Sequence, residues 1–298
     1  MIRSKETFLN QEYVEPNDIQ PGQLCYIGAG YNTSYEFQGL DKAPNSIRSI
    51  SQRYANGVGP AKPLMVFNPT RGYILHDCNI VDCGDANGFV DMDHGFPKII
   101  STIVQKNGIP IIVGGDHGIT IHALKGLELS TPVTVYQFDA HGDYLNYDAG
   151  FPHGSVMRAV RGLKYVDRIV HIGLHGNLNT GPGLEDSLSD GNTILTLDKI
   201  RENGLNSLDG IIISGQFSYV SFDMDFLDPS IAPAVGVPEP DGANFRMARL
   251  LLEKIALQTH VIGADFTEYN PTLEKYEITG LHLTNLLMEF MSSLSRQQ

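Results

Sequence analysis

The sequence is poor in cysteine, in positive charge and in long apolar runs. Its three cysteines include no CxxC pair, so neither a disulfide framework nor a thiolate zinc site is indicated. Lysine and arginine number 21 against 34 acidic residues, and the net charge of -13 argues against nucleic acid or an anionic membrane surface as a partner. No apolar run approaches the length needed to cross a bilayer.

These absences set an expectation for location. We expect Cys25, Cys78 and Cys83 to be reduced thiols, and residues 1–18 are polar, without the apolar core of a signal peptide. We therefore expect a soluble, cytoplasmic protein. A small cationic substrate is compatible with the acidic balance, although net charge does not select one.

The sequence does contain a series of short apolar, β-branched runs. Most are apolar at both alternating positions, which is typical of parallel strands covered on both faces. These predicted strands lie at residues 24–29, 79–85, 109–115, 133–139, 168–174, 217–223 and 261–266.

Stretches with helical spacing separate the predicted strands. Amphipathic stripes run through residues 96–108 and 244–258. In residues 43–57, Asn45 can cap a helix and Gly57 can end one. This alternation predicts a three-layer α-β-α fold around one mostly parallel central sheet.

No linker, repeat or low-complexity tract divides the chain, so we expect a single domain over residues 1–298. The loops at 56–73, 142–153 and 176–192 are rich in glycine, asparagine and proline. Such loops are free to line a binding site.

Four of the predicted strands end in acidic residues or histidines. Ligands bind beyond the carboxyl ends of strands in an open parallel sheet, so we expect these side chains to converge. They are Asp116, His117, Asp139, His141, Asp143, Asp223, Asp225, Asp228 and Glu268.

Each cluster alone also has a structural explanation. Asp116 can turn or cap the chain, and Asp228 fits the turn after its strand. The side chains of the DAHGD motif share one direction only while the backbone stays extended. Asp223 and Asp225 favour a binding site, because two acids at the end of an apolar strand repel each other unless a cation lies between them.

The candidate ligands offer two imidazoles and four carboxylates, too many anions for one closed tetrahedral zinc site. They suit two divalent cations close together, with one water between them. Oxygen-rich ligation favours manganese over zinc and leaves other first-row metals open. A deacetylase-like single-zinc site would leave several carboxylates without a cation. The ligands are His117, Asp139, His141, Asp143, Asp223 and Asp225.

The motifs GGDH, DAHGD and SFDMDFLDPSIAP, in this order, resemble those of the ureohydrolase family, which includes arginase, agmatinase and guanidino-acid hydrolases. The segments IGAGYNTSYEFQGLDKAPNSIR, VDCGDA and DFTEYNP extend the resemblance over most of the chain. It implies an arginase-like fold, two Mn²⁺ per subunit and hydrolysis of a small guanidino substrate to urea and an amine. It also implies a homo-oligomer, a trimer or a hexamer.

The resemblance also implies how the two metals are shared. One manganese would be held by His117, Asp139, Asp143 and Asp223. The other would be held by Asp139, His141, Asp223 and Asp225, so that Asp139 and Asp223 bridge the two ions.

Three further roles concern the reaction itself. The departing amine leaves only if it is protonated, and Asp143 can carry that proton. His153 matches the family's proton-transfer histidine and can relay protons to solvent. Glu268 matches the acid that holds the guanidinium, a planar pair that can form two hydrogen bonds.

The chain departs from the family pattern after its second acidic pair. Val235 and Val237 stand where threonines are expected, and Asp241 replaces a glycine. Loss of a hydroxyl near the reacting carbon can change the substrate or weaken the activity, or the valines can simply repack the wall.

The loop after Asp143 contains no lysine or arginine that could bind a substrate carboxylate. This favours a guanidino-amine such as agmatine, with Asn146 and Asp148 as substrate contacts and Asp148 as a partner for the ammonium. His175, with its neighbouring asparagines, can instead bind an α-amino acid or carboxylate.

Two alternatives remain open. A formimino-compound hydrolase would keep the metal site and release formamide, and a metal-binding paralogue would have altered or lost turnover. The remaining histidines have no companion spacing and receive no role: His76, His94, His122, His171, His260 and His282.

Overall fold

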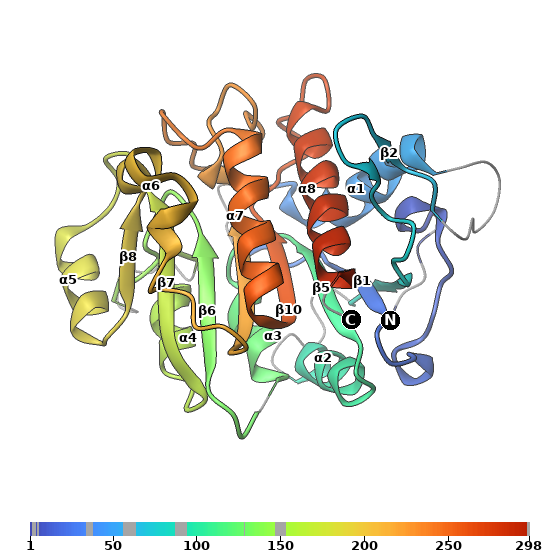
Figure 1. Cartoon of the computed structure of the whole chain (residues 1–298), viewed down its shortest axis with the longest axis horizontal. Helices are drawn as coiled ribbons and strands as arrows, with labels where there is room; N and C mark the ends of the chain where they lie inside the picture. Colours follow the sequence, from blue (N-terminus) through green and yellow to red (C-terminus); the bar gives the residue numbers. More distant parts are fainter. Residues whose placement is uncertain are drawn as a thin grey trace.

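The computed structural model describes residues 1, 4, 6–33, 38–55, 64–86, 94–127, 129–146 and 153–296. Within them an eight-stranded sheet runs through the centre in the order β4-β1-β5-β10-β9-β6-β7-β8. Every neighbouring pair in this sheet is parallel. Helices cover both faces, which confirms the predicted three-layer α-β-α fold (Figure 1).

Seven of the eight strands lie within two residues of the predicted runs. All residues of β1 and β6 are buried, as expected for strands covered on both sides. The strands are β1 (Leu24–Ala29), β4 (Ile80–Asp85), β5 (Ile109–Gly114), β6 (Val133–Phe138), β7 (Val166–Leu174), β8 (Thr193–Thr196), β9 (Phe217–Asp223) and β10 (His260–Thr267).

Strand β8 was missed because it is a short edge strand whose residues are mostly only half-buried. It therefore lacks the continuous apolar run that marks the other strands. The loop predicted at 56–73 also contains, in its described part, a small antiparallel hairpin of β2 (Phe67–Asn68) and β3 (Gly72–Tyr73).

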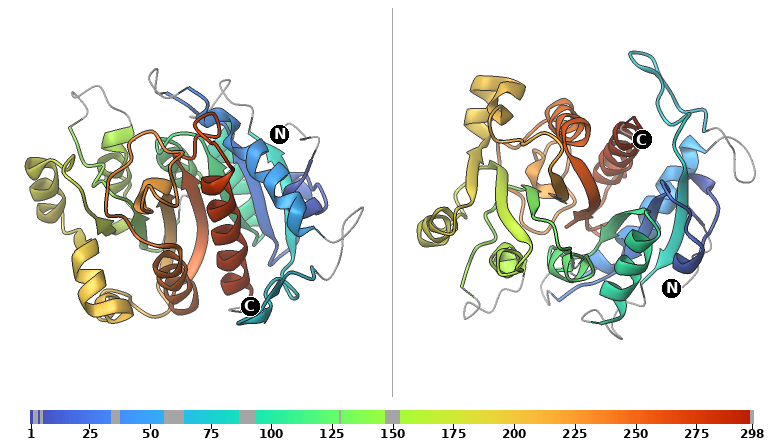
Figure 2. Two further views of the ribbon diagram at one scale, coloured as in Figure 1. Left: turned by 90° about the horizontal axis from the view of Figure 1, so that it is seen from above. Right: turned by 60° about the horizontal axis from the view of Figure 1, so that its bottom comes forward.

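The helices form two layers, each packed on its own apolar cluster. One face of the sheet carries α1 (Ala43–Ser51), α6 (Leu197–Asn203), α7 (Phe245–Gln258) and α8 (Ile278–Ser295). The other face carries α2 (Gly95–Gln105), α3 (Ile119–Lys125) and α4 (Val156–Arg161). Seen from above in Figure 2, the strands lie between these two sets. The predicted loop at 176–192 contains a helix, α5 (Gly181–Ser189), beside β8.

Two predicted helix ends were wrong. Asn45 does not cap α1, because the helix already begins at Ala43, and its amide oxygen instead accepts a hydrogen bond from Arg48. Helix α2 ends at Gln105, because Asn107 adopts a left-handed conformation with φ 59°. Gly57 lies outside the described residues.

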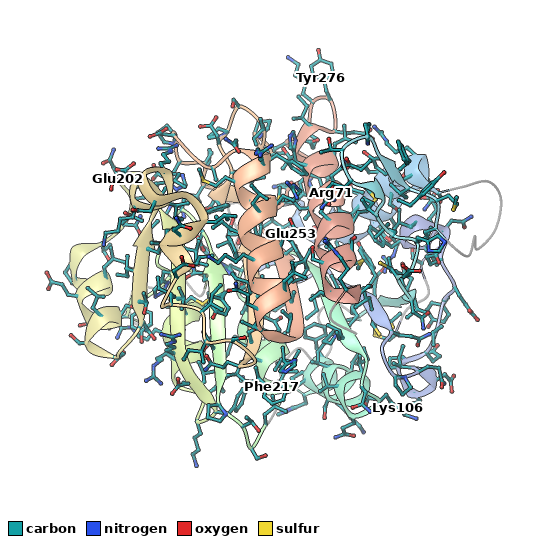
Figure 3. All side chains as sticks on the ribbon, in the orientation of Figure 1. Arg71, Lys106, Glu202, Phe217, Glu253 and Tyr276 are labelled. Carbon is teal, nitrogen blue, oxygen red and sulfur yellow. The ribbon has the colours of Figure 1, made fainter. Side chains whose placement is uncertain are left out.

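Cys25, Cys78 and Cys83 are free thiols, as predicted. Among the residues described, none of the helices combines the length and apolar character of a membrane span. Figure 3 shows exposed Tyr276 at the outer tip of the loop that leads from β10 into α8.

The four strands that end in acidic residues are neighbours in space. They occupy the middle of the sheet in the order β5-β10-β9-β6, although β6 and β9 are far apart in sequence. Because all four point the same way, their carboxyl ends meet at one edge. The sheet order thus brings the predicted clusters together.

Candidate metal centre

His117, which follows β5, is surrounded by carboxylates from two other strands. Its Nδ1 atom lies 3.2 Å from Asp139 Oδ2, 2.8 Å from Asp143 Oδ2 and 3.3 Å from Asp223 Oδ2. The His117 side chain is only 1% exposed, so these groups meet away from solvent. They form the first candidate metal cluster.

His141 is the centre of a second cluster beside the first. Its Nδ1 atom lies 2.9 Å from Asp225 Oδ2 and 3.5 Å from Asp139 Oδ1. The potential ligand atoms of His117, Asp139 and Asp223 lie within 4.8 Å of one another, and so do those of Asp139, His141 and Asp225. Asp139 belongs to both groups, with one carboxylate oxygen on each side, so two neighbouring cations could share it.

Short backbone contacts fix the carboxylates. The His141 amide donates to Asp139 Oδ1 at 2.6 Å, and the Asp225 amide donates to Asp223 Oδ1 at 2.9 Å. The Ala140 amide donates to Asp225 Oδ1 at 3.0 Å, which ties the end of β6 to the segment after β9. The Asp139 and Asp223 carboxylates are thus held by local turns, and the Asp225 carboxylate by a contact between the ends of two strands.

A buried chain of polar groups behind His117 sets its tautomer. Tyr219 and Ser221 donate to Asp265 at 2.7 and 2.8 Å, so the Ser221 oxygen is left to accept from His117 Nε2, 2.8 Å away. Nε2 therefore carries a proton, and Nδ1 faces the three carboxylates, which outweigh burial and raise the pKa of His117 in the metal-free protein. Nδ1 would become a metal ligand on losing its proton.

The electrostatics of the centre are those of an anionic cluster short of positive charge. Burial and the charge of Asp139 raise the pKa of Asp225 to about 6. Burial and Asp225 likewise raise the pKa of Asp223, and burial and Asp139 that of Asp143. Burial lowers the pKa of His141, but Asp139 and Asp225 outweigh it and raise the value to about 12. Without further cations the cluster thus retains protons.

Glu268 closes the centre from β10. Its Oε1 atom accepts the backbone N–H of His117 at 2.7 Å. Burial and nearby Asp116 raise the pKa of Glu268 to about 8. Glu268 and Asp143 both have positive φ, 64° and 47°, a costly conformation for residues other than glycine. Strain of this kind is commonly found at functional sites.

The residues present fit a pair of divalent cations. The donor set combines two imidazole nitrogens with four carboxylates, and the buried His117 Nδ1 atom, which has no hydrogen-bond partner among the described residues, faces carboxylate oxygens. Divalent cations would neutralise the carboxylates whose pKa values are raised, as oxygen-rich sites for hard metals do.

Two of the predicted structural roles are confirmed. Asp116 accepts the backbone N–H of Gly118 at 2.9 Å and that of Thr33 at 2.5 Å, so it shapes the turn after β5. Asp228 accepts the backbone N–H of Ser230 at 2.9 Å and thus shapes the turn after β9.

The loop after Asp143 is described only in part. Asn146 is exposed, and Asp148 lies outside the described residues. His153 begins a short 3-10 helix, and the adjacent Gly154 carbonyl accepts the Leu145 N–H at 3.0 Å. The described ends of the loop therefore fold back on each other beside the metal cluster.

His175 lies next to the centre through its backbone, which donates to the Ala140 carbonyl at 3.1 Å. The neighbouring Asn179 side chain is engaged in holding the loops together. It accepts from the Gly142 N–H at 2.9 Å and donates to the carbonyls of Ala140 and His175 at 2.8 and 3.0 Å. Asn179, one of the two asparagines proposed beside His175, therefore has a structural role in joining the two loops.

Sequence reasoning missed Glu239, a buried acid in the loop after β9. Its carboxylate accepts backbone N–H groups of Asn177 and Leu178 at 3.3 and 3.2 Å. Its Oε1 atom also lies 3.8 Å from His141 Nε2, a buried ring atom that has no hydrogen-bond partner within the described ranges. Glu239 therefore ties the 175–179 loop to the metal cluster. Its position in a proline-rich turn gave no signal of this.

Sequence reasoning also assigned no role to Gln137 and His171. Both are fully buried, and the Gln137 amide donates to Asp139 Oδ2 at 2.6 Å. His171 Nδ1 contacts the Gln137 carbonyl oxygen. Polar residues inside otherwise apolar strands were the only available signal.

The departures from the family pattern also have structural explanations. Val235 is buried in the core and pairs with Tyr269 in an isolated antiparallel bridge, whereas Val237 is half-buried. Asp241 has φ 65°, the left-handed region that favours glycine, and its carboxylate pairs with Arg201 at 2.8 Å. The aspartate thus occupies a position suited to glycine and gains a surface ion pair.

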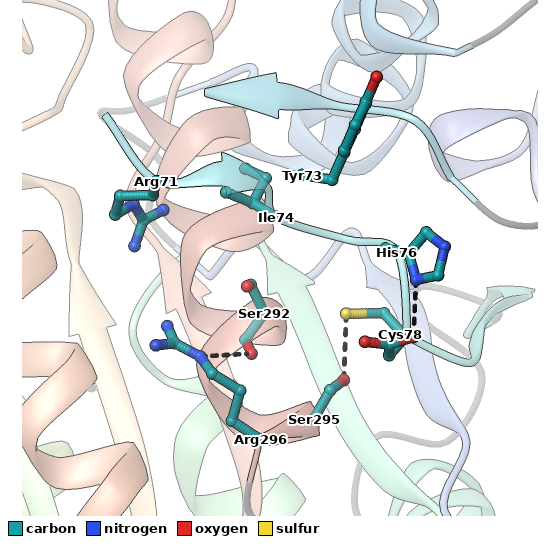
Figure 4. Close-up of a pocket in the computed structure, with 9 residues that line it drawn as sticks. Arg71, Tyr73, Ile74, His76, Cys78, Ser292, Ser295 and Arg296 are labelled. Atoms are coloured by element: carbon teal, nitrogen blue, oxygen red, sulfur yellow. Dashed lines mark hydrogen bonds and ion pairs between the residues drawn. The ribbon is translucent and has the colours of Figure 1, made fainter. Parts of the chain in front are cut away.

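A cavity of about 280 Å³ lies elsewhere, between α8 and the segment that follows β3 (Figure 4). Its arginines already have acidic partners, because Arg71 pairs with Glu289 and Arg296 pairs with Glu253. Helix α8 runs back from the carboxyl ends of the strands, so this cavity is separate from the metal cluster (Figure 1).

Comparisons with known proteins agree with this geometry. Residues 23–292 match the sequence model of the family described as "Arginase family". The chain is 30% identical to proclavaminate amidinohydrolase of Streptomyces clavuligerus, over 94% of this chain and 91% of that protein. It is 32% identical to the mitochondrial arginase of Medicago truncatula, over 92% and 82% of the two chains. A solved structure of the S. clavuligerus enzyme superposes with a TM-score of 0.84 at 26% identity, covering 99% of this chain and 98% of that one.

Proposed function

The chain belongs to the arginase family, and from this premise we propose that it is a dinuclear manganese amidinohydrolase, which cleaves a guanidino compound to urea and an amine. The observation that carries the proposal is the sharing of Asp139 between two metal clusters. In this proposal residues 1–298 form a single catalytic domain.

The proposed ligands divide as the family resemblance implies. His117, Asp139, Asp143 and Asp223 hold one Mn²⁺, and Asp139, His141, Asp223 and Asp225 hold the other. The distance of 2.8 Å between His117 Nδ1 and Asp143 Oδ2 supports Asp143 as a member of the first set. When bound, the two cations supply Lewis-acid chemistry and lower the pKa of a water between them.

The remaining steps belong to the side chains. Glu268 pairs with the substrate guanidinium, whose positive charge favours the ionised carboxylate despite its raised pKa. Asp143 holds the proton that the departing amine needs, and His153 exchanges protons with solvent. The N–H of His117 fixes the Glu268 carboxylate at 2.7 Å and so orients the guanidinium beside the cluster.

The proposed substrate is a guanidino-amine of the agmatine type or a guanidino acid. The absence of lysine and arginine from residues 144–152 supports the amine. Asn146, Asp148 and His175 are the proposed contacts to the far end of the molecule. The backbone of His175 lies beside Ala140, close enough to the ligand motif to support its inclusion.

The test is urea release by protein that has been dialysed free of metal and reloaded with Mn²⁺. The panel is arginine, agmatine, guanidinobutyrate, guanidinopropionate, guanidinoacetate and guanidine. We expect turnover of at least one compound, its loss in Asp139→Ala and Asp223→Ala, and its retention in Asp209→Ala, an exposed acid paired with Lys254. A separate assay with a formimino compound would identify that alternative by release of formamide, and manganese binding without any product would indicate a paralogue that has lost turnover.

We further propose a cytoplasmic homo-oligomer, a trimer or a hexamer. The three free thiols support a reducing compartment, and the family resemblance supports the assembly. Sedimentation should give three or six times the chain mass of 32.7 kDa. A monomeric species at working concentration would contradict the assembly.

A further inference from the structure

We propose that Gln137 and His171 are positioning residues that hold the Asp139 carboxylate in the orientation needed to bridge two cations. The inference rests on the proposed function, because it concerns the same metal centre. Neither residue touches the substrate in this account. Both act through Asp139.

The two residues face each other across neighbouring strands. Gln137 on β6 is the direct register partner of His171 on β7. The Gln137 amide nitrogen donates to Asp139 Oδ2 at 2.6 Å, and it lies 3.3 Å from the His141 carbonyl. Asp139 Oδ1 accepts from the His141 N–H at 2.6 Å, so each carboxylate oxygen has its own donor. The plane of the carboxylate is fixed from both sides.

The direction of each hydrogen bond in the series from Asp139 through Gln137 and His171 follows from the Asp139 carboxylate. Ionised Asp139 can only accept, so Gln137 must present its NH₂ group to Asp139 and its carbonyl oxygen to His171. His171 Nδ1 then donates to that oxygen, and His171 Nε2 accepts from the hydroxyl of Ser187, 2.8 Å away. Asn192 donates to the Ser187 oxygen at 3.1 Å and completes the chain.

The side chains of this hydrogen-bonded series beyond Asp139 are all buried, and none of them is charged. Gln137, His171 and Ser187 are 0% exposed, and Asn192 is 6% exposed. Without the His171 N–H, the buried Gln137 carbonyl oxygen would lose its donor, and the amide would lose the contact that holds it against Asp139. A histidine that orients a glutamine can therefore control a ligand that it does not touch.

Loss of the partners that orient a ligand typically weakens metal binding roughly 10- to 100-fold. We expect this loss for His171→Phe, which removes the donor and fills the space, and for Gln137→Met, which removes the amide. His171→Asn retains an N–H near the position of Nδ1, so it should bind manganese more tightly than His171→Phe. This rescue distinguishes positioning from a simple packing role.

The experiment is competition between the protein and a chelating indicator for Mn²⁺, with the metal-free melting temperature measured alongside. Thr134→Val is the matched control, because Thr134 lies on the same strand and is also 0% exposed, and its hydroxyl has no hydrogen-bond partner in the part of the chain that the structure describes. We expect wild-type affinity for the control and the ranking wild type, His171→Asn, His171→Phe for the others. If His171→Phe does not fold, Gln137→Met and Ser187→Ala test the same hydrogen-bonded series.

The outcomes separate this inference from the proposed function. Wild-type manganese affinity in folded His171→Phe and Gln137→Met would overturn the positioning role and leave the metal centre intact. A lower melting temperature with unchanged affinity would overturn it in the same way, because it would mark a packing role. Failure of the wild-type protein to bind Mn²⁺ would overturn the metal centre and the inference together.

Discussion

Two buried charge clusters in this protein differ in how their charges are compensated. Near the β4 edge, Arg48 is fully buried and binds Asp82 through two nitrogens, at 2.8 and 3.1 Å, and Asp85 at 2.6 Å. Its guanidinium also lies 4.8 Å from the centre of the Tyr26 ring. In the middle of the sheet, the metal cluster brings four aspartates to two histidines, with no lysine or arginine among the described ion pairs there.

The difference in charge compensation indicates the role of each cluster. Burial lowers the pKa of Arg48, but Tyr26, Asp82 and Asp85 outweigh it and keep the guanidinium charged. The first cluster has its own cation and joins α1 to the sheet, although burial raises the pKa of Asp85. In the second, burial and neighbouring aspartates raise the pKa values of Asp223 and Asp225, which is the property of a site that needs cations from outside.

The largest predicted effect is on the Arg48 cluster. Arg48→Met leaves buried Asp82 and half-buried Asp85 without a cation and should lower the free energy of unfolding by about 3–5 kcal/mol. Urea denaturation measures this loss. Arg53→Met is the control: Arg53 is 45% exposed and pairs with an exposed glutamate, so it should change stability by less than about 1 kcal/mol. Equal losses in both variants would remove the distinction between buried and exposed pairs.

The second prediction concerns pH in the metal-free protein. Glu268 has its pKa raised from 4.5 to about 8 and His141 from 6.5 to about 12, so the folded state retains protons that the unfolded state loses. Stability is therefore highest at low pH in this window and falls between pH 6 and 9, by up to about 1.4 kcal/mol per pH unit for each retained proton.

The check is thermal unfolding of metal-free and manganese-loaded protein at pH 6, 7, 8 and 9. Manganese should raise the melting temperature more at pH 8 than at pH 6, because it displaces protons from its ligands. A melting temperature of the metal-free protein that rises from pH 6 to pH 9 would show that positive charge within the protein already compensates the carboxylates.

Asp223→Asn should have a smaller effect of the opposite sign to Arg48→Met. The pKa of Asp223 is raised by burial and by Asp225, so a neutral amide is better tolerated there than a carboxylate. We expect the metal-free protein to gain about 1 kcal/mol near pH 8, a melting-temperature rise of a few degrees. The stabilisation by manganese should be lost. Destabilisation of the metal-free variant would mean that this charge is balanced within the protein.

The smallest effect is expected at a charge pair outside both clusters. Asp241 pairs with Arg201, and its side chain is 79% exposed. Asp241→Asn keeps a residue that tolerates positive φ and removes only an exposed charge, so the free energy of unfolding should stay close to the wild-type value. Urea denaturation of this variant sets the baseline for the other two substitutions. A loss as large as that of Arg48→Met would show that exposure does not govern these energies.

The sequence was sufficient for the parts of the molecule that are encoded locally. The apolar runs predict seven of the eight central strands, and the DAHGD motif places Asp139, His141 and Asp143 within one turn of the end of β6. Strand β8 was not predicted, because this edge strand does not form a continuous apolar run. The position of Asn45 in the helix was predicted wrongly, because an asparagine in the first turn and one at the N-cap cannot be distinguished in sequence.

The groups around the ligands could not be predicted because they depend on pairing between distant segments. Gln137 and His171 meet only through the register of β6 and β7. Glu239 reaches His141 from the loop after β9, and Asn179 bridges backbone groups from two loops. The sequence motifs were therefore sufficient to predict the candidate ligands, whereas the side chains that would orient those ligands could be identified only from the fold.

The central claim is that the anionic cluster holds two cations, and the metal content of the protein tests it most directly. The metal-free chain would be equilibrated with Mn²⁺ at pH 8, freed of unbound ion and analysed for manganese and for protein. We predict two Mn²⁺ per chain in the wild-type protein and a loss of bound metal in Asp139→Ala, which removes the shared ligand. One metal per chain, or none, in the wild-type protein would contradict the claim.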